Sequence, residues 1–218
     1  SGASLGFVAL RSNIAPTGGD YTFITDTSSG LLQLEVATFT NPINMALVGD
    51  GRMQLGGSVT YSATTLGAGS DNTYRLGGLG GTLTFTAANL NVLTGANNVI
   101  IGSLATNGNG LVTLNNSNNF TGTVQIARGS TATIVSGGAG VTPLGNAANV
   151  INVYGTLQNS NSATSAFTDN TGAAIYANIN LFPGSVLRID DTTAFTGPGG
   201  NGRWNDTADI NLNGAQLT

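Results

Sequence analysis

Residues 110–129 read GLVTLNNSNNFTGTVQIARG and contain two short runs in which apolar and polar side chains alternate. Residues 112–114 are Val-Thr-Leu, and residues 124–126 are Val-Gln-Ile. This alternation predicts two half-buried strands, each with one apolar face. Between them the chain must turn a corner. We expect Phe120 to fill that corner with its ring, and Gly122 to adopt a backbone conformation closed to other residues. The side chains expected to point into a core are Val112, Leu114, Val124 and Ile126.

The same alternation recurs along the chain and predicts further short strands near residues 32–36, 82–86, 151–153, 175–181, 187–189 and 210–212. Segments rich in Gly and Asn separate these runs, and both residues tolerate the positive φ that tight corners require. No segment has the apolar spacing of an amphipathic helix over three turns. The sequence therefore predicts an all-β protein.

Two all-β architectures fit many short strands at regular spacing: an antiparallel β-sandwich and a parallel β-helix, in which coils of strands stack as a solenoid. Strands recur in clusters about every 20–25 residues, a period expected of solenoid repeats. The exposed positions carry Thr and Asn, and uncharged side chains can stack in register where like charges would repel. These features favour a parallel β-helix, as a single domain over residues 1–218, and leave the sandwich as the alternative.

Residues 110–157 resemble the autotransporter-associated β-strand repeat of bacteria, which reads roughly G-x-L-T-L-x-x-x-N-x-[YF]-[ST]-G-x-T-x-[VI]-x-x-G. Leu144-Gly145 and Gly155-Thr156-Leu157 stand where that family has a Leu-Gly loop and a Gly-Thr-Leu strand end. Residues 184–218 resemble, more loosely, a module found beside that repeat in long bacterial surface proteins. The resemblance implies a right-handed parallel β-helix that is extracellular or at the bacterial cell surface, and it supplies no catalytic residues.

The composition argues against several classes of function. Only 7% of the residues are charged, the net charge is -4, and all six basic residues are Arg. A nucleic-acid-binding protein needs a basic face, which six scattered arginines do not provide. The chain has no His and no Cys, and so lacks the commonest general base, thiolate chemistry and the usual zinc ligands. No apolar run approaches the roughly 18 residues of a membrane-spanning helix. We therefore expect no catalytic residue, no cofactor, no metal site and no membrane span.

Asp190 and Asp191 form the one adjacent pair of carboxylates, and Asp206 and Asp209 could lie near them in space. Such a cluster could form a calcium site or a polysaccharide-cleaving site, but these sites need several carboxylates and a base on one face. Arg188 shares the outward face with Asp190 at i, i+2. We interpret the two as a surface ion pair of little energetic weight.

Three further features suggest a function and are interpreted as structural. Residues 197–202 match the G-x-G-x-x-G of dinucleotide-binding proteins but do not join a strand to a helix. Residues 77–81 resemble calcium-binding nonapeptide repeats but lack their Asp residues. Trp204, beside Arg203, could offer a sugar-stacking platform, although a corner plug is the simpler interpretation. Glycosylation-type sequons, which arise by chance in a chain rich in Asn and Thr, begin at Asn115, Asn119 and Asn205.

The leading hypothesis is a structural protein, acting as a stiff spacer or as a subunit of a fibre or filament. Residues 212–218 read LNGAQLT, which predicts a strand still in progress. We therefore expect the same solenoid to continue, or to self-associate through its strand ends. The alternative is an adhesin-type module for glycans or neighbouring cells, with its specificity in loops 11–30 and 191–205. A polysaccharide-cleaving enzyme on the same fold is the least favoured hypothesis.

Overall fold

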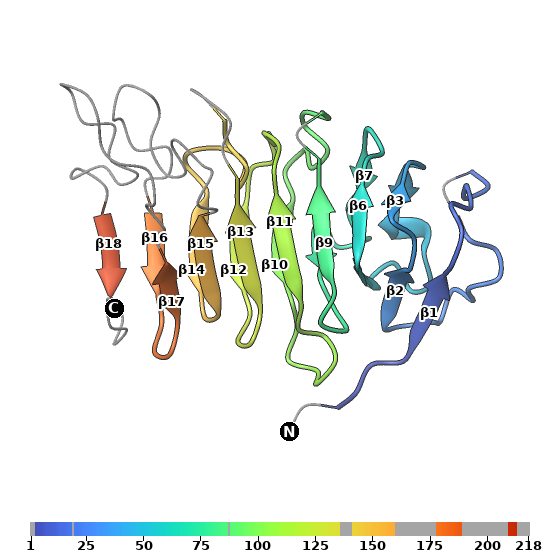
Figure 1. Ribbon diagram of the computed structural model, residues 1–218, viewed down its shortest axis with the longest axis horizontal. Coiled ribbons are helices and arrows are strands. Elements are labelled where there is room, and N and C mark those ends of the chain that lie inside the picture. The colour runs from blue at the N-terminus through green and yellow to red at the C-terminus, as the bar shows by residue number, and fades with distance from the viewer. Residues whose placement is uncertain are drawn as a thin grey trace.

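The structure, a computed structural model, describes residues 3–18, 20–86, 88–135, 141–159, 178–188 and 209–212, with only the backbone for Asn159 and residues 209–212. Within these residues every pairing between strands is parallel. The strands stack in one row from β1 to β18 (Figure 1). This arrangement is a parallel β-helix, as predicted, and the antiparallel sandwich is wrong.

One sheet has nine strands and extends along the whole row. In spatial order they are β1 (Phe7–Leu10), β2 (Leu31–Leu34), β5 (Gln54–Gly57), β8 (Thr73–Leu76), β10 (Asn98–Ile101), β12 (Thr123–Ile126), β14 (Val150–Val153), β16 (Asn178–Leu181) and β18 (Asp209–Leu212). The sequence separation of paired residues in this sheet gives the length of each coil. It is smallest between Leu55 and Leu76, at 21 residues, and largest between Asn178 and Asp209, at 31 residues. The coils therefore lengthen toward β18, beyond the predicted period.

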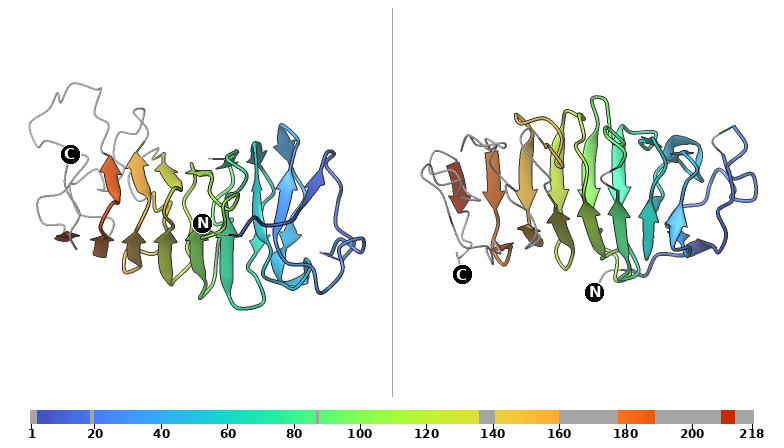
Figure 2. Two further views of the ribbon diagram at one scale, coloured as in Figure 1. Left: turned by 90° about the horizontal axis from the view of Figure 1, so that it is seen from below. Right: turned by 45° about the horizontal axis from the view of Figure 1, so that its top comes forward.

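A second sheet has seven strands and lies opposite the first. Its strands are β3 (Thr38–Phe39), β6 (Val59–Tyr61), β9 (Thr82–Phe85), β11 (Leu111–Leu114), β13 (Thr131–Ile134), β15 (Thr156–Asn159) and β17 (Val186–Arg188). Two views from other sides show the same stacked row (Figure 2). A third, two-stranded sheet joins β4 (Ile43–Asn44) to β7 (Leu66–Gly67), and the one helical turn of the described residues is η1 (Met45–Leu47).

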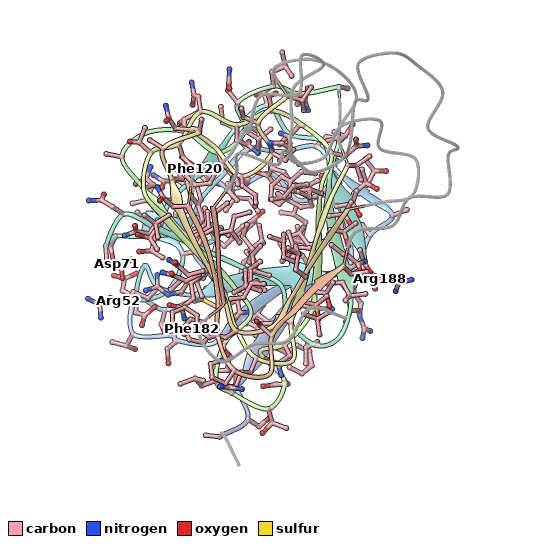
Figure 3. The ribbon with its side chains drawn as sticks, turned by 90° about the vertical axis from the view of Figure 1, so that its left-hand side faces the viewer. Arg52, Asp71, Phe120, Phe182 and Arg188 are labelled. Atoms are coloured by element: carbon pink, nitrogen blue, oxygen red, sulfur yellow. The ribbon has the colours of Figure 1, made fainter. Side chains whose placement is uncertain are left out.

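The core lies between the two large sheets, and its side chains stack in columns along the row. Figure 3 looks along the row and shows the two sheets as walls with side chains packed between them. One column is fully or almost fully buried and consists of Leu32, Leu55, Leu76, Ile101, Ile126, Val153 and Leu181. The facing column is Phe39, Tyr61, Phe85, Leu114 and Ile134. Each such side chain contributes on the order of 2 kcal/mol through burial.

The outer faces carry largely uncharged columns, as the sequence predicted, with Arg75 and Arg188 as charged members. On the seven-stranded sheet Thr60, Thr84, Thr113 and Thr133 occupy one register position in successive strands. On the nine-stranded sheet the amide of Asn180 donates to the Oδ1 of Asn152, at 3.0 Å. At a strand spacing of about 4.8 Å, charges of one sign at these positions would repel one another.

The corner between β11 and β12 confirms one prediction and corrects another. Phe120 is fully buried there, as expected of a corner plug (Figure 3). Gly122 does not have the positive φ that the sequence suggested. Glycine is needed because an added Cβ would collide with the backbone oxygen of Asn97 in the preceding coil. Gly129, which closes the next turn, does have a left-handed φ of +74°.

Residues 11–30 cover the β1 end of the core. They lie between two adjacent strands of the nine-stranded sheet, where a strand of the seven-stranded sheet would otherwise lie. Tyr21 and Ile24 are buried in the core cluster, and Asn13 accepts a hydrogen bond from the backbone N–H of Thr40 at 3.1 Å. We refer to residues 11–30 as the N-terminal cap.

Residues 3–6 run back along the row from β1 and reach the turn between β10 and β11 (Figure 1). Leu5 and the side chain of Asn107 exchange two hydrogen bonds, with 2.6 Å from the Leu5 nitrogen to Oδ1 and 2.7 Å from Nδ2 to the Leu5 oxygen. The backbone N–H of Thr106 also donates to the oxygen of Ala3 at 3.2 Å. We refer to residues 3–6 as the N-terminal strap.

Candidate functional site

A cleft of about 610 Å³ opens where the chain passes from the seven-stranded to the nine-stranded sheet, beside β4 and β7. Its walls come from the N-terminal cap and from three successive coils. The lining residues are Ala15, Pro16, Asn41, Pro42, Ile43, Asn44, Thr65, Leu66, Gly67, Ala68, Tyr74, Thr94 and Asn97. A volume of this size falls within the range of small-molecule binding sites in proteins.

Two buried tyrosines fix the backbone of the cleft from the core side. The hydroxyl of Tyr61 accepts from the backbone N–H of Ile43 at 3.1 Å and donates to the oxygen of Thr65 at 2.8 Å. The hydroxyl of Tyr74 lies 3.1 Å from both the backbone nitrogen and the backbone oxygen of Thr94. Burial raises the pKa of Tyr61 well above its ordinary value, so its hydroxyl remains protonated and able to donate.

The contact of β4 with β7 depends on a small residue at one position. Asn44 caps η1, because its Oδ1 accepts from the backbone N–H of Ala46 at 3.2 Å. Gly67 pairs with Asn44 across the two-stranded sheet. A Cβ on Gly67 would lie 2.6 Å from that same Oδ1, which is too close for any side chain. The cap of η1 and the pairing of the two strands therefore require glycine at this position.

The lining of the cleft is uncharged but rich in polar atoms. None of its residues is Asp, Glu or Arg. Five side-chain atoms of the lining residues form no hydrogen bond within the part of the chain that the structure describes: Asn41 Oδ1, Asn44 Nδ2, Thr65 Oγ1, Thr94 Oγ1 and Asn97 Oδ1. The lining residues thus carry two amide acceptors, one amide donor and two hydroxyls without a partner in the described protein.

A cluster of charged side chains around Asp71 lies outside the cleft, on the side of the nine-stranded sheet. Arg75 forms a bidentate pair with this carboxylate, with oxygen–nitrogen distances of 2.9 and 2.6 Å, and Arg52 lies 4.0 Å from it. The hydrogen bond from Arg75 lowers the pKa of Asp71. Arg52 and Asp71 lie on the outer surface of that wall (Figure 3). A carboxylate satisfied in this way is a poor general base, since both of its oxygens are already paired.

A second, shallower hollow of about 310 Å³ lies on the outer face of the seven-stranded sheet, lined by Ala37, Ser58, Val59, Thr60, Thr82 and Thr84. Its polar side chains are hydroxyls, and Val59 is the buried residue of its lining. It offers fewer kinds of polar group than the cleft does.

Most of the candidate residues from the sequence lie outside the described residues: Asp190, Asp191, residues 197–202, Arg203, Trp204, Asn205 and Asp206. Asp209 begins β18 and pairs with Asn178. Arg188 ends β17 and points away from the core (Figure 3). Residues 77–81 form a corner, in which Gly77, Gly78 and Gly80 have positive φ. Among the described residues, no three His, Cys, Asp or Glu side chains lie close enough together to hold a metal ion.

Sequence reasoning did not identify the cleft residues. Asn41, Asn44, Thr65, Thr94 and Asn97 are polar residues in irregular segments, and such residues are abundant throughout this chain. The one usable signal was the interruption of the strand rhythm, which singled out loop 11–30. Ala15 and Pro16 of that loop do line the cleft.

Comparison with known proteins gave no match to any protein-family model, to any curated protein or to any solved structure. Within the described residues, no helix has the length and the apolar character needed to span a membrane.

Proposed function

We propose that this chain is a structural β-solenoid that acts as a stiff spacer or as a subunit of a fibre. The observation that carries the proposal is the continuous nine-stranded ladder, with buried columns of side chains behind it. Backbone hydrogen bonds run along the row in a parallel β-helix, and each coil is held by its neighbours. Bending such a row would break hydrogen bonds and open gaps in the core at the same time.

The surface location of this spacer is part of the proposal and rests on the resemblance of residues 110–157 to the autotransporter-associated repeat. The largely uncharged outer columns of Thr and Asn support an extended, repetitive role. Self-association through strand ends is the corresponding mode of assembly. Among the described strands, β18 pairs only with β16, and β1 pairs only with β2. Unpaired strand edges of this kind accept further strands.

Electron microscopy across a concentration series, in neutral buffer without metal, tests the proposal. Rods with a β-helical stretch of about 38 Å, from nine strands at about 4.8 Å spacing, are expected for a spacer. Long uniform filaments of the same width are expected for a fibre subunit. Flexible or collapsed particles would contradict both forms of the proposal.

Two lysine substitutions then distinguish growth through β1 from lateral association. Phe7 lies on β1 and is 55% exposed, whereas Leu111 lies on the outer face of the seven-stranded sheet and is 41% exposed. Phe7→Lys is expected to shorten filaments that grow through β1, because a lysine on an edge strand opposes strand addition. Leu111→Lys is the matched control and is expected to leave filament length unchanged.

A further inference from the structure

We infer that the cleft beside β4 and β7 is a binding site for a neutral saccharide, such as a short segment of an uncharged polysaccharide. This inference goes beyond the spacer function and does not depend on whether the rods assemble. It rests on the chemistry of the lining, the preformed geometry and the place of the cleft on the rod.

The absence of charge in the lining selects against most other ligand classes. A nucleotide or any other phosphorylated ligand needs cationic partners, and a metal ion needs carboxylates, but the lining contains neither. The carboxylate of Asp71, which lies outside the cleft, is engaged with Arg75. An acidic or basic sugar would lose its hydration here without gaining a partner of opposite charge.

The lining also matches the alternating surface of a sugar ring. A neutral sugar presents hydroxyls, which donate and accept, together with patches of C–H. The cleft supplies the amide and hydroxyl atoms named above as partners for the hydroxyls, and apolar surface for the C–H patches from Pro16, Pro42, Ile43 and Leu66. A purely apolar ligand would leave the five polar atoms of the cleft without partners, at a cost for each atom that becomes buried.

The cleft is held in place before any ligand binds. Tyr61 joins β4 to the segment before β7, and Tyr74 holds Thr94, so the wall segments are attached to the core by buried hydroxyls. A preformed site loses little conformational entropy on binding, which matters for a ligand that gains only a few hydrogen bonds. The cap contributes Ala15 and Pro16 to one wall, and so gives a role to a loop that interrupts the coil rhythm.

Amide-resolved NMR titration of the intact chain with neutral oligosaccharides of glucose, galactose, mannose and N-acetylglucosamine tests the inference. At least one of them is expected to shift the amide signals of Gly67, Ala68, Thr94 and Asn97 in a saturable manner. An oligogalacturonate of similar length serves as the anionic probe and is expected to cause smaller shifts. If no neutral oligosaccharide shifts these signals up to its solubility limit, or if only the anionic probe binds, the inference is overturned.

Three variants locate the site and separate binding from folding. Thr65→Val and Thr94→Val each remove a hydroxyl that has no partner in the protein, and each is expected to weaken binding roughly three- to tenfold. Ala15→Trp fills the cleft from the exposed cap and is expected to abolish binding. Thr131→Val, on the outer face of the seven-stranded sheet, is the control and is expected to bind normally.

Thermal unfolding of each variant shows whether it folds. Undiminished binding by a folded Ala15→Trp variant would place the sugar elsewhere and overturn the assignment, whereas the rods expected in electron microscopy would be unaffected.

Discussion

At the scale of single residues, buried Asn side chains join neighbouring coils at the corners by hydrogen bonds, as backbone hydrogen bonds join them in the sheets. Asn118 is 1% exposed and reaches both neighbouring coils. Its Oδ1 accepts from the backbone N–H of Leu93 at 3.0 Å, and its Nδ2 donates to the oxygen of Pro143 at 2.9 Å. Asn149 also bonds backbone groups of a neighbouring coil, donating to the oxygen of Phe120 and accepting from the N–H of Gly122. These amides satisfy backbone groups where no strand can.

Replacing Asn118 with alanine is expected to lower the free energy of unfolding by about 2–4 kcal/mol. The backbone N–H of Leu93 and the carbonyl of Pro143 would lose their amide partner in a buried corner, and each such group costs about 1–3 kcal/mol. Denaturant-induced unfolding followed by circular dichroism measures the change. The adjacent Asn119 is exposed, so Asn119→Ala is the control and is expected to cost less than about 0.5 kcal/mol. Equal effects for the two variants would show that the corner amide is not a structural clamp.

At the scale of elements, the N-terminal cap seals one end of the core with an irregular loop and its aromatic side chain. Tyr21 is 2% exposed, and its hydroxyl donates to the backbone oxygen of Ile14 at 3.1 Å. Burial raises the pKa of Tyr21 to about 12, from an ordinary value near 10. A folded-state pKa above the unfolded one means that the neutral phenol stabilises the cap below about pH 10. This contribution is lost as the pH rises through about 12.

The wild-type chain is therefore expected to lose stability between about pH 9 and pH 11 more steeply than a Tyr21→Phe variant, by roughly 1–2 kcal/mol. Phenylalanine fills the same space but has no proton to lose. Urea unfolding of both proteins at the two pH values measures the difference. Each protein is compared with itself at the lower pH. The stability that Tyr21→Phe loses with the hydrogen bond to Ile14 is then the same at both pH values and cancels. Identical slopes would show that the Tyr21 phenol is not sealed from solvent.

The sequence predicts regular elements much better than irregular ones, for a physical reason. The predicted strands are present where they fall within the described residues, because only one face of an alternating strand is apolar and can be buried. Residues 175–177, 189 and 213–218 of these predictions lie outside the described residues. Strands β3, β4 and β7 escaped prediction because they contain two residues each, too few to show a period. The longer strands β1, β5, β6, β8, β10 and β13 were not predicted either. The cleft escaped for another reason. Its lining extends from Ala15 to Asn97 along the chain, and only the stacking register brings these segments together.

At the scale of the whole molecule, the N-terminal strap departs from the usual behaviour of a solenoid. In a simple solenoid each coil contacts only its neighbours, so the ends can open independently of the middle. Here the strap begins beside β1 and meets the turn after β10, which lies four places along the nine-stranded sheet. Opening the β1 end therefore requires breaking contacts in a distant coil as well. The strap should make the first five strands of that sheet unfold more nearly as one unit.

Replacing Asn107 with alanine tests this coupling, because it removes both hydrogen bonds to Leu5. Amide hydrogen exchange at Leu5 and in β1 is expected to become at least tenfold faster. Exchange in β12 and β14, beyond the reach of the strap, should be nearly unchanged. Leu104→Ala is the control in the same turn, since Leu104 is 86% exposed. If exchange in β1 stays as slow in Asn107→Ala as in the control, the strap does not stabilise the β1 end. Contacts between neighbouring coils would then account for the protection of β1. If exchange accelerates in β1 alone, the coupling runs through this one side chain, and the stiffness of the β1 end depends on a contact made 102 residues along the chain.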